Sequence, residues 1–135
     1  MVARHAVTQA TASYRRRFAD RLDGSHFKLY NNLWFSSIGM GVYLHAGDQN
    51  AEQATLECRR ALFDAVRAGC NHLDTAITHQ SQLGEQALGQ ALASAFAKGY
   101  VSRNEIIISA RGGRVLFRGN YPADARRCAG DSLRR

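Results

Sequence analysis

The chain has 135 residues, of which 45% are hydrophobic and 21% are charged, and its formal net charge is +7. This balance is typical of one globular domain and excludes a chain that is disordered throughout. No stretch approaches the roughly 20 apolar residues of a membrane span, and the N-terminus lacks a long apolar leader, so we expect no membrane partner.

The first third of the chain shows weak patterns. Residues 1–13 are small and polar, and we expect a mobile N-terminal arm there, followed by one domain over residues 14–135. Asp23-Gly24 is a hairpin-turn signal, because both residues tolerate a positive φ. The flanking residues alternate weakly, and together they predict a short β-hairpin between residues 14 and 35.

The centre of the chain alternates between strand and helix patterns. A short apolar run punctuated by glycines, residues 37–43, predicts a strand. A helix is expected to begin near Ala51, after a capping Asp48 or Asn50, and to end at Gly69. Its apolar residues recur at the helical period of 3.6, namely Ala54, Cys58, Ala61, Leu62, Ala65 and Val66.

The alternation continues toward the C-terminus. Residues 72–76 predict a short buried strand, and residues 85–98 predict a second helix that Gly99 ends. Residues 105–110 are rich in β-branched side chains, which favours a third strand buried on both faces. This order of elements is typical of an α/β fold with a parallel sheet and right-handed crossovers.

Three cysteines stand far apart, at Cys58, Cys70 and Cys128. Without a CxxC pair they indicate neither a redox couple nor a zinc site. Cys58 and Cys70 fall in a predicted helix and at the entry to a predicted strand, where a reduced thiol behaves as a small apolar group. This usage favours a reducing compartment, and we expect the protein in the cytoplasm.

Arginine clusters at residues 15–17, 126–127 and 134–135 carry much of the positive charge. They could bind phosphates non-specifically, or they could form a solvated surface. The sequence shows no nucleic-acid-binding motif and no Cys/His finger spacing, so nucleic acid is not the favoured partner. A non-enzymatic basic protein that binds a partner chain or a polyanion through these arginines is the alternative function.

Five short motifs resemble those of aldo-keto reductases. Residues 37–44, SIGMGVYL, resemble the family's first barrel strand, Leu-Gly-Leu-Gly-Thr-Tyr. Residues 69–76, GCNHLDTA, resemble its second strand, Gly-Ile-Asn-x-Ile-Asp-Thr-Ala. Residues 85–92 match Glu-x-x-Leu-Gly-x-Ala-Leu, residues 103–109 resemble the Arg-Asp-Glu that leads into strand three, and Gly112-Gly113 resembles its closing glycines. Such motifs are specific when they occur in order at the family's spacings.

The resemblance covers roughly residues 36–122 and implies a (β/α)₈ TIM barrel with its active site at the carboxyl ends of the strands. The predicted elements amount to a partial barrel, with about three parallel strands, two helices and an N-terminal β-hairpin. The family reaction is hydride transfer between NADP(H) and a small carbonyl compound or alcohol. Two unpaired sheet edges could also allow the chain to associate with itself.

Four residues carry catalysis in the family: a proton-donating tyrosine, a lysine that lowers its pKa, an aspartate that pairs with the lysine, and a histidine from strand four. The resemblance places Asp74 at the aspartate, His79 at the tyrosine and Arg111 at the lysine. A histidine can donate a proton near neutral pH, but its ring is shorter than a phenol. Arginine stays protonated, so Arg111 and Asp74 would form a salt bridge rather than a proton relay.

The resemblance also implies where NADP(H) would contact the chain. Gly41, Val42, Tyr43 and Asp74 match positions near the nicotinamide, although a polar threonine is usual at Val42. In this fold the phosphate-binding site is commonly built by loops after strands seven and eight, beyond the region of resemblance. We therefore expect little or no activity from the chain alone. The histidines show no metal-ligand spacing, so no metal is predicted.

Overall fold

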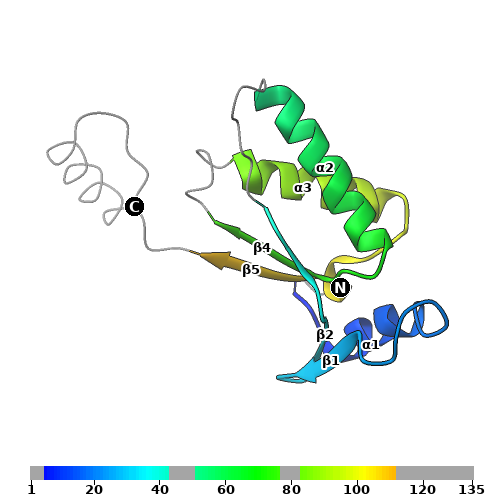
Figure 1. Cartoon of the computed structure of the whole chain (residues 1–135). Coiled ribbons are helices and arrows are strands. Elements are labelled where there is room, and N and C mark those ends of the chain that lie inside the picture. Colours follow the sequence, from blue (N-terminus) through cyan, green and yellow to red (C-terminus); the bar gives the residue numbers. More distant parts are fainter. Residues whose placement is uncertain (1–4, 43–50, 77–82, 112–135) are drawn as a thin grey trace, which may run out of the picture.

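The computed structural model describes residues 5–42, 51–76 and 83–111 (Figure 1). A parallel sheet of three strands is covered on one face by two helices, and a helix and a two-stranded hairpin lie at one end of it. The elements in chain order are α1 (Thr8–Arg16), β1 (Phe27–Tyr30), β2 (Leu33–Ser36), β3 (Gly39–Gly41), α2 (Ala51–Arg67), β4 (His72–Ala76), α3 (Leu83–Ala97), the 3₁₀ helix η1 (Arg103–Glu105) and β5 (Ile107–Arg111).

The three-stranded sheet has the predicted parallel order, with β4 between β3 and β5. Gly39 pairs with His72, and His72 in turn pairs with Ile107, so the three strands begin side by side. Helices α2 and α3 pack against each other above the sheet, where Leu73 of β4 is fully buried. The predicted α/β architecture with two crossover helices is therefore confirmed. None of the helices that the structure describes is long and apolar enough to cross a membrane.

The end of α2 follows the predicted glycine stop. Gly69 has φ of 105°, in the left-handed region that favours glycine, and the next amide, Cys70 N, donates to Ala65 O at 3.0 Å. The turn is also crowded, because a Cβ added at Gly69 would lie 2.6 Å from Cδ1 of Leu22. Glycine is thus favoured at this position for two reasons, the positive φ of the backbone and the close approach of the Leu22 side chain.

Gly69→Ala is expected to lower the free energy of unfolding by about 2 kcal/mol, because alanine disfavours this φ and its Cβ would displace Leu22. Urea denaturation followed by circular dichroism measures the change. Gly89→Ala in α3 is the matched control, since no atom lies within 4 Å of the added Cβ and alanine favours helix. A similar loss in both variants would show that the turn at Gly69 is not specially constrained.

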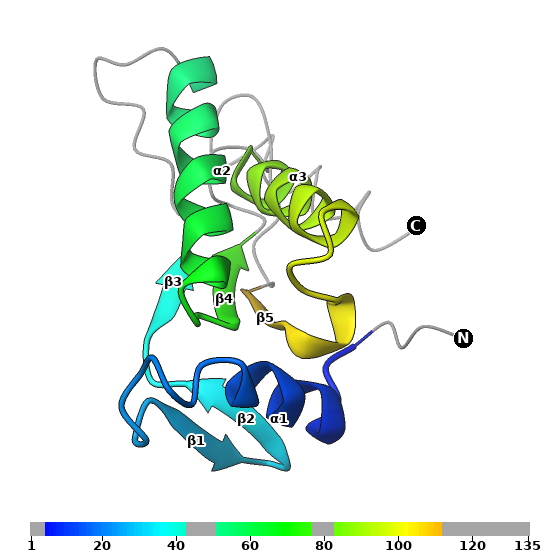
Figure 2. The same cartoon turned by 90° about the vertical axis from the view of Figure 1, so that its right-hand side faces the viewer.

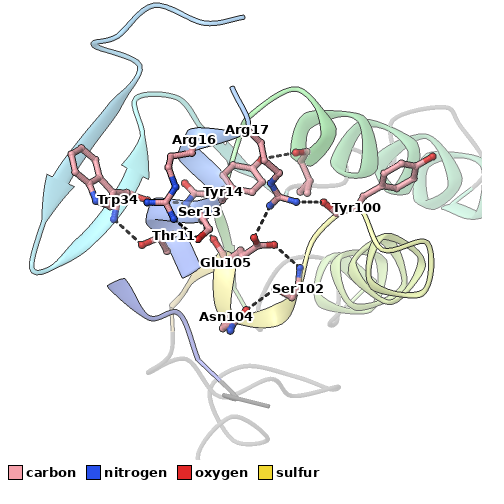
Figure 3. Close-up of polar contacts among 12 residues, drawn as sticks. Thr11, Ser13, Tyr14, Arg16, Arg17, Trp34, Tyr100, Ser102, Asn104 and Glu105 are labelled. Atoms are coloured by element: carbon pink, nitrogen blue, oxygen red, sulfur yellow. Dashed lines mark hydrogen bonds and ion pairs between the residues drawn. The ribbon is translucent and has the colours of Figure 1, made fainter. Parts of the chain in front are cut away.

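The N-terminal region differs from the predicted arm, because residues 8–13 form the first part of α1. Thr11 and Tyr14 are buried on its inner face, and the Tyr14 hydroxyl donates to the carbonyl of Val66 at the end of α2. Arg17, just beyond the helix, pairs with Glu105 at 2.7 Å (Figure 3). Helix α1 is therefore fixed by contacts with residues more than 50 positions away along the chain.

The predicted hairpin exists, but its turn lies elsewhere. Asn31 and Asn32 connect β1 to β2 and have φ of 45° and 61°. A two-residue hairpin loop of this kind needs a positive φ at both positions, which asparagine tolerates. Asp23-Gly24 instead forms a turn before β1, in which the Asp23 carboxylate accepts a 2.8 Å hydrogen bond from Ser25 N.

The third strand of the sheet begins later than predicted. Glu105 belongs to η1, where its carboxylate accepts a hydrogen bond from Ser102 N at 2.8 Å and caps the turn. Strand β5 starts at Ile107, which is buried, and ends at Arg111, which is exposed. The prediction of a strand buried on both faces therefore holds for its first half only.

Candidate active site

The carboxyl ends of the parallel strands bring together residues that are far apart in sequence. Register partners in adjacent parallel strands present their side chains on the same face, and Gly41, Asp74 and Ser109 are such partners. Arg111 stands two pairs further along β5, opposite Ala76. Asp74 alternates along β4 with Leu73 and Thr75, which are both buried, so its side chain lies on the opposite face of the sheet from theirs.

Asp74 and Arg111 form an ion pair at this end of the sheet. Nη2 of Arg111 donates to Oδ2 of Asp74 at 2.9 Å, and the two side chains are 66% and 34% exposed, respectively. Water and ions screen a pair this exposed, so it contributes little to stability. Its chemical significance is that the guanidinium keeps its proton and can neither give nor accept one in a reaction.

A second polar pair lies next to Asp74 and was not predicted from the sequence. Nε2 of His72 is 2.8 Å from Oγ of Ser109, and the Phe35 ring of the hairpin meets the His72 imidazole edge to face at 5.3 Å. Residues two apart on a strand share a face, so the position of Asp74 also places His72 on this side. The spacing of two residues between His72 and Asp74 is the feature of the sequence that could have indicated a site position for His72.

The other residues predicted to contact the cofactor or the substrate differ in exposure, and some lie outside the described residues. Gly41 borders open space, since a Cβ added there would meet no atom within 4 Å. The side chain of Val42 is fully buried, on the opposite side of the strand, and its amide donates to Asp74 O at 2.7 Å. Tyr43 and His79 lie outside the described residues. The structure thus brings together Gly41, Asp74 and Arg111.

Metal ligands do not gather in the part of this site that the structure describes. Across residues 5–42, 51–76 and 83–111, no group of three or more His, Cys, Asp or Glu side chains could hold a metal ion. Burial raises the pKa of the Cys70 thiol, which lies in the core at the entry to β4, so this cysteine is not poised as a nucleophile there.

Comparison with known proteins relates the chain to one family. The model of the aldo/keto reductase family matches residues 37–135. Aldo-keto reductase AKR2E4 of Bombyx mori is 38% identical over 81 residues, which cover 60% of this chain and 24% of that protein. NAD(P)H-dependent 6'-deoxychalcone synthase of Glycine max is 38% identical over 74 residues, which cover 55% of this chain and 21% of that protein.

The structural comparison agrees with the sequence comparison. The crystal structure of the Bombyx mori enzyme in complex with NADP matches with a TM-score of 0.52 and 24% identity, over 78% of this chain and 32% of that one. The chain thus spans about a quarter of the length of these curated relatives. The likeness in structure supports a partial barrel fold. Since the family model matches well over half of its residues, the chain belongs to the aldo/keto reductase family.

Proposed function

We propose that the chain supplies the first three strands of an NADP(H)-dependent carbonyl reductase site, and that alone it has little or no such activity. One observation carries this proposal, the ion pair between Asp74 and Arg111 at the carboxyl ends of β4 and β5. Family members have an aspartate and a lysine at these two positions. Bound cofactor would supply a hydride to the carbonyl carbon, while a protein acid must protonate the carbonyl oxygen.

The described residues fit the nicotinamide end of the cofactor. A Cβ added at Gly41 would meet no atom within 4 Å, and the Asp74 carboxylate is partly exposed, so both positions are accessible to a ligand. Val42 would contribute only through its backbone, because its side chain is buried. Loops that commonly hold phosphate in this fold follow strands seven and eight, whereas the described residues form three parallel strands. Cofactor binding by the chain alone should therefore be weak.

Two substitutions would impair proton delivery at this site. Arg111 forms an ion pair with Asp74. A permanently protonated guanidinium, however, does not adjust the pKa of a neighbouring acid as the family's lysine does. His79 would have to donate the proton from a ring that is shorter than a phenol. A displacement of about 1 Å in a reacting group can cost about 10²-fold in rate.

The double variant His79→Tyr with Arg111→Lys is expected to raise NADPH-dependent reduction of 4-nitrobenzaldehyde about 10²-fold over the unmodified chain. Loss of NADPH absorbance at 340 nm measures the rate. The double variant His5→Tyr with Arg21→Lys makes the same exchanges at exposed positions away from the sheet and should leave the rate unchanged.

Cofactor binding is measured separately, as the shift of the thermal unfolding midpoint by NADPH. A ligand present at 100 times its Kd adds about 2.7 kcal/mol to stability. Rapid turnover by the unmodified chain would contradict the proposed impairment. A double variant that binds NADPH and yet stays inactive would contradict the expected gain, because restoring these two residues would then not restore proton delivery on the first three strands.

The alternative function, a basic protein that binds a partner chain or a polyanion, gains no support from the first arginine cluster. Arg15 stacks over the Trp34 ring at 4.1 Å, Arg16 donates to the Ser13 hydroxyl at 2.8 Å, and Arg17 pairs with Glu105. Each guanidinium is thus engaged within the chain, and the other two clusters lie outside the described residues. Self-association through the edges of β3 and β5, and a cytoplasmic location, stay predictions.

A further inference from the structure

The two helices that cover the sheet enclose a groove on their outer side. Leu56, Arg59, Arg60 and Phe63 of α2 follow helical spacing and line a cavity of about 190 Å³, closed on the other side by α3 and Lys98. A second cavity of about 370 Å³ shares Leu56 and Arg59 and continues along the helix pair. We call these two neighbouring cavities the α2–α3 groove.

Three cationic side chains, Arg59, Arg60 and Lys98, line the first cavity of this groove, and one carboxylate, Glu52, lines the second. The ion pairs among the described residues involve neither Arg59 nor Arg60 nor Lys98. Nε of Arg59 is buried and has no hydrogen-bond partner, which leaves a charged donor unsatisfied at a cost in free energy. A ligand with an anionic group would supply the missing acceptor after a small movement of the side chain.

The floor of the groove is apolar. Leu56 is 37% exposed, and the Phe63 ring is held between the Lys98 ammonium at 4.9 Å and the edge of the Tyr100 ring at 5.5 Å. An apolar body could therefore cover Leu56 and Phe63 while its charged end meets the arginines. The α2–α3 groove thus combines the two chemical features that an amphipathic anion presents.

The groove is separate from the Asp74 site. Helices α2 and α3 form a layer beside the sheet (Figures 1 and 2), and the lining residues of the groove belong to these helices and to Lys98, whereas Asp74 and Arg111 belong to β4 and β5. The two helices are direct neighbours, so strands added at either edge of the sheet would not enter between them.

We propose that the α2–α3 groove binds an amphipathic carboxylate, a small molecule with an apolar body and one carboxylate group. Arg59 and Arg60 would receive the carboxylate, because a guanidinium fork matches its two oxygens. Leu56 and Phe63 would contact the apolar body. This site lies outside the nicotinamide region, and it does not depend on carbonyl reduction.

The test uses decanoate as the probe, at a concentration below micelle formation and at fixed ionic strength. Amide chemical shifts of the 135-residue chain are expected to move mainly in residues 56–63 and 91–98. Acetate, which lacks the apolar body, and decyltrimethylammonium, which reverses the charge, should each bind at least about 10-fold more weakly. Equal binding of decanoate and decyltrimethylammonium would overturn the proposal, because the arginines would then play no part.

The double variant Arg59→Gln with Arg60→Gln should weaken decanoate binding about 10-fold, since charge-assisted hydrogen bonds to the carboxylate are lost. The matched control, Arg16→Gln with Arg21→Gln, removes the same charge at exposed positions outside the groove and should change binding less than about 2-fold. Equal losses in the two variants would indicate non-specific electrostatics. Shifts confined to the strand ends around Asp74 would assign decanoate to the active site instead.

The NADPH-induced thermal shift is recorded for the same groove variant. An unchanged shift together with weakened decanoate binding supports two independent sites. Loss of both in the groove variant would contradict the separation of the groove from the cofactor site.

Discussion

Tyr14→Ala is expected to lower the free energy of unfolding by about 4 kcal/mol, the largest effect we predict for a single side chain. Tyr14 is 1% exposed, and its ring packs against Phe18 at 5.0 Å and Phe27 at 6.0 Å between centroids. Removal leaves a cavity where α1, the hairpin and α2 meet. Urea denaturation followed by circular dichroism measures the loss, which is large against the marginal stability of a small domain.

Tyr14→Phe separates the hydroxyl from the ring. It should cost about 1–2 kcal/mol, because the carbonyls of Val66 and Cys70 lose their donor. If Tyr14→Phe destabilises as much as Tyr14→Ala, the ring contributes little and the packing argument fails. If Tyr14→Phe costs nothing, the hydroxyl does not hold α1 against the end of α2.

The unmodified chain and Tyr14→Phe should also differ in how their free energy of unfolding changes in alkaline solution. Burial raises the pKa of Tyr14 well above the ordinary tyrosine value of about 10. A raised folded-state pKa gives stability that is present in full below pH ~10 and is lost as pH rises above it. Between pH 9 and 11 the unmodified chain should therefore lose stability more steeply than Tyr14→Phe, in which position 14 carries no ionisable group.

Asn71→Ala is expected to cost about 3–4 kcal/mol, because it removes the centre of a buried polar network. Asn71 is fully buried; its Oδ1 accepts from Ser36 N at 2.9 Å, and its Nδ2 donates to Trp34 O at 2.8 Å and Glu105 O at 3.3 Å. The side chain thus joins the hairpin to the start of β4 and to η1. Three backbone groups would lose their partner at once.

Denaturant unfolding of Asn71→Ala is compared with that of Asn104→Ala. The Asn104 side chain makes only an exposed hydrogen bond with the Ser102 hydroxyl, so its removal should cost less than about 1 kcal/mol. Equal costs at the two positions would mean that the network around Asn71 adds nothing beyond local turn structure.

Both stability predictions concern the end of the sheet where the strands begin. Helix α1 and the hairpin lie at this end, beside η1, and Asp74 and Arg111 lie toward the other (Figure 2). In barrel folds residues at the amino ends of strands usually serve stability, whereas those at the carboxyl ends serve catalysis. Variants at Tyr14 and Asn71 therefore test folding without altering the proposed site.

Local patterns in the sequence predicted the central part of the fold correctly. Helix α2, strand β4 and helix α3 each have an apolar period that belongs to one type of element, and Gly69 and Gly99, both at positive φ, end the helices as expected. The parallel order of the strands followed from their alternation with helices. These features depend on residues that are close together in the chain, so they can be predicted from the sequence alone.

The site was predictable only in part. Motif resemblance placed Asp74 and Arg111, although 37 positions separate them, and the register of β4 with β5 then brought them within 2.9 Å. The contact between His72 and Ser109 and the burial of Val42 depend on which face of each strand the helices cover. The packing of the sheet against α2 and α3 determines which face is covered, and the sequence of one strand alone does not show it.

The N-terminal region was decided by tertiary structure. Helix α1 has no capping side chain and no acidic residue in its first turn, so its sequence lacks the usual signals of a helix start. Its stability comes from Tyr14 in the core and from Arg17 on Glu105, contacts that form only when the strands are in place. The sequence by itself determined α2, β4 and α3 because their periodic apolar faces are local. Only the folded chain determined α1 and the contacts at the site, because long-range burial stabilises α1 and the register of β4 with β5 creates the site contacts.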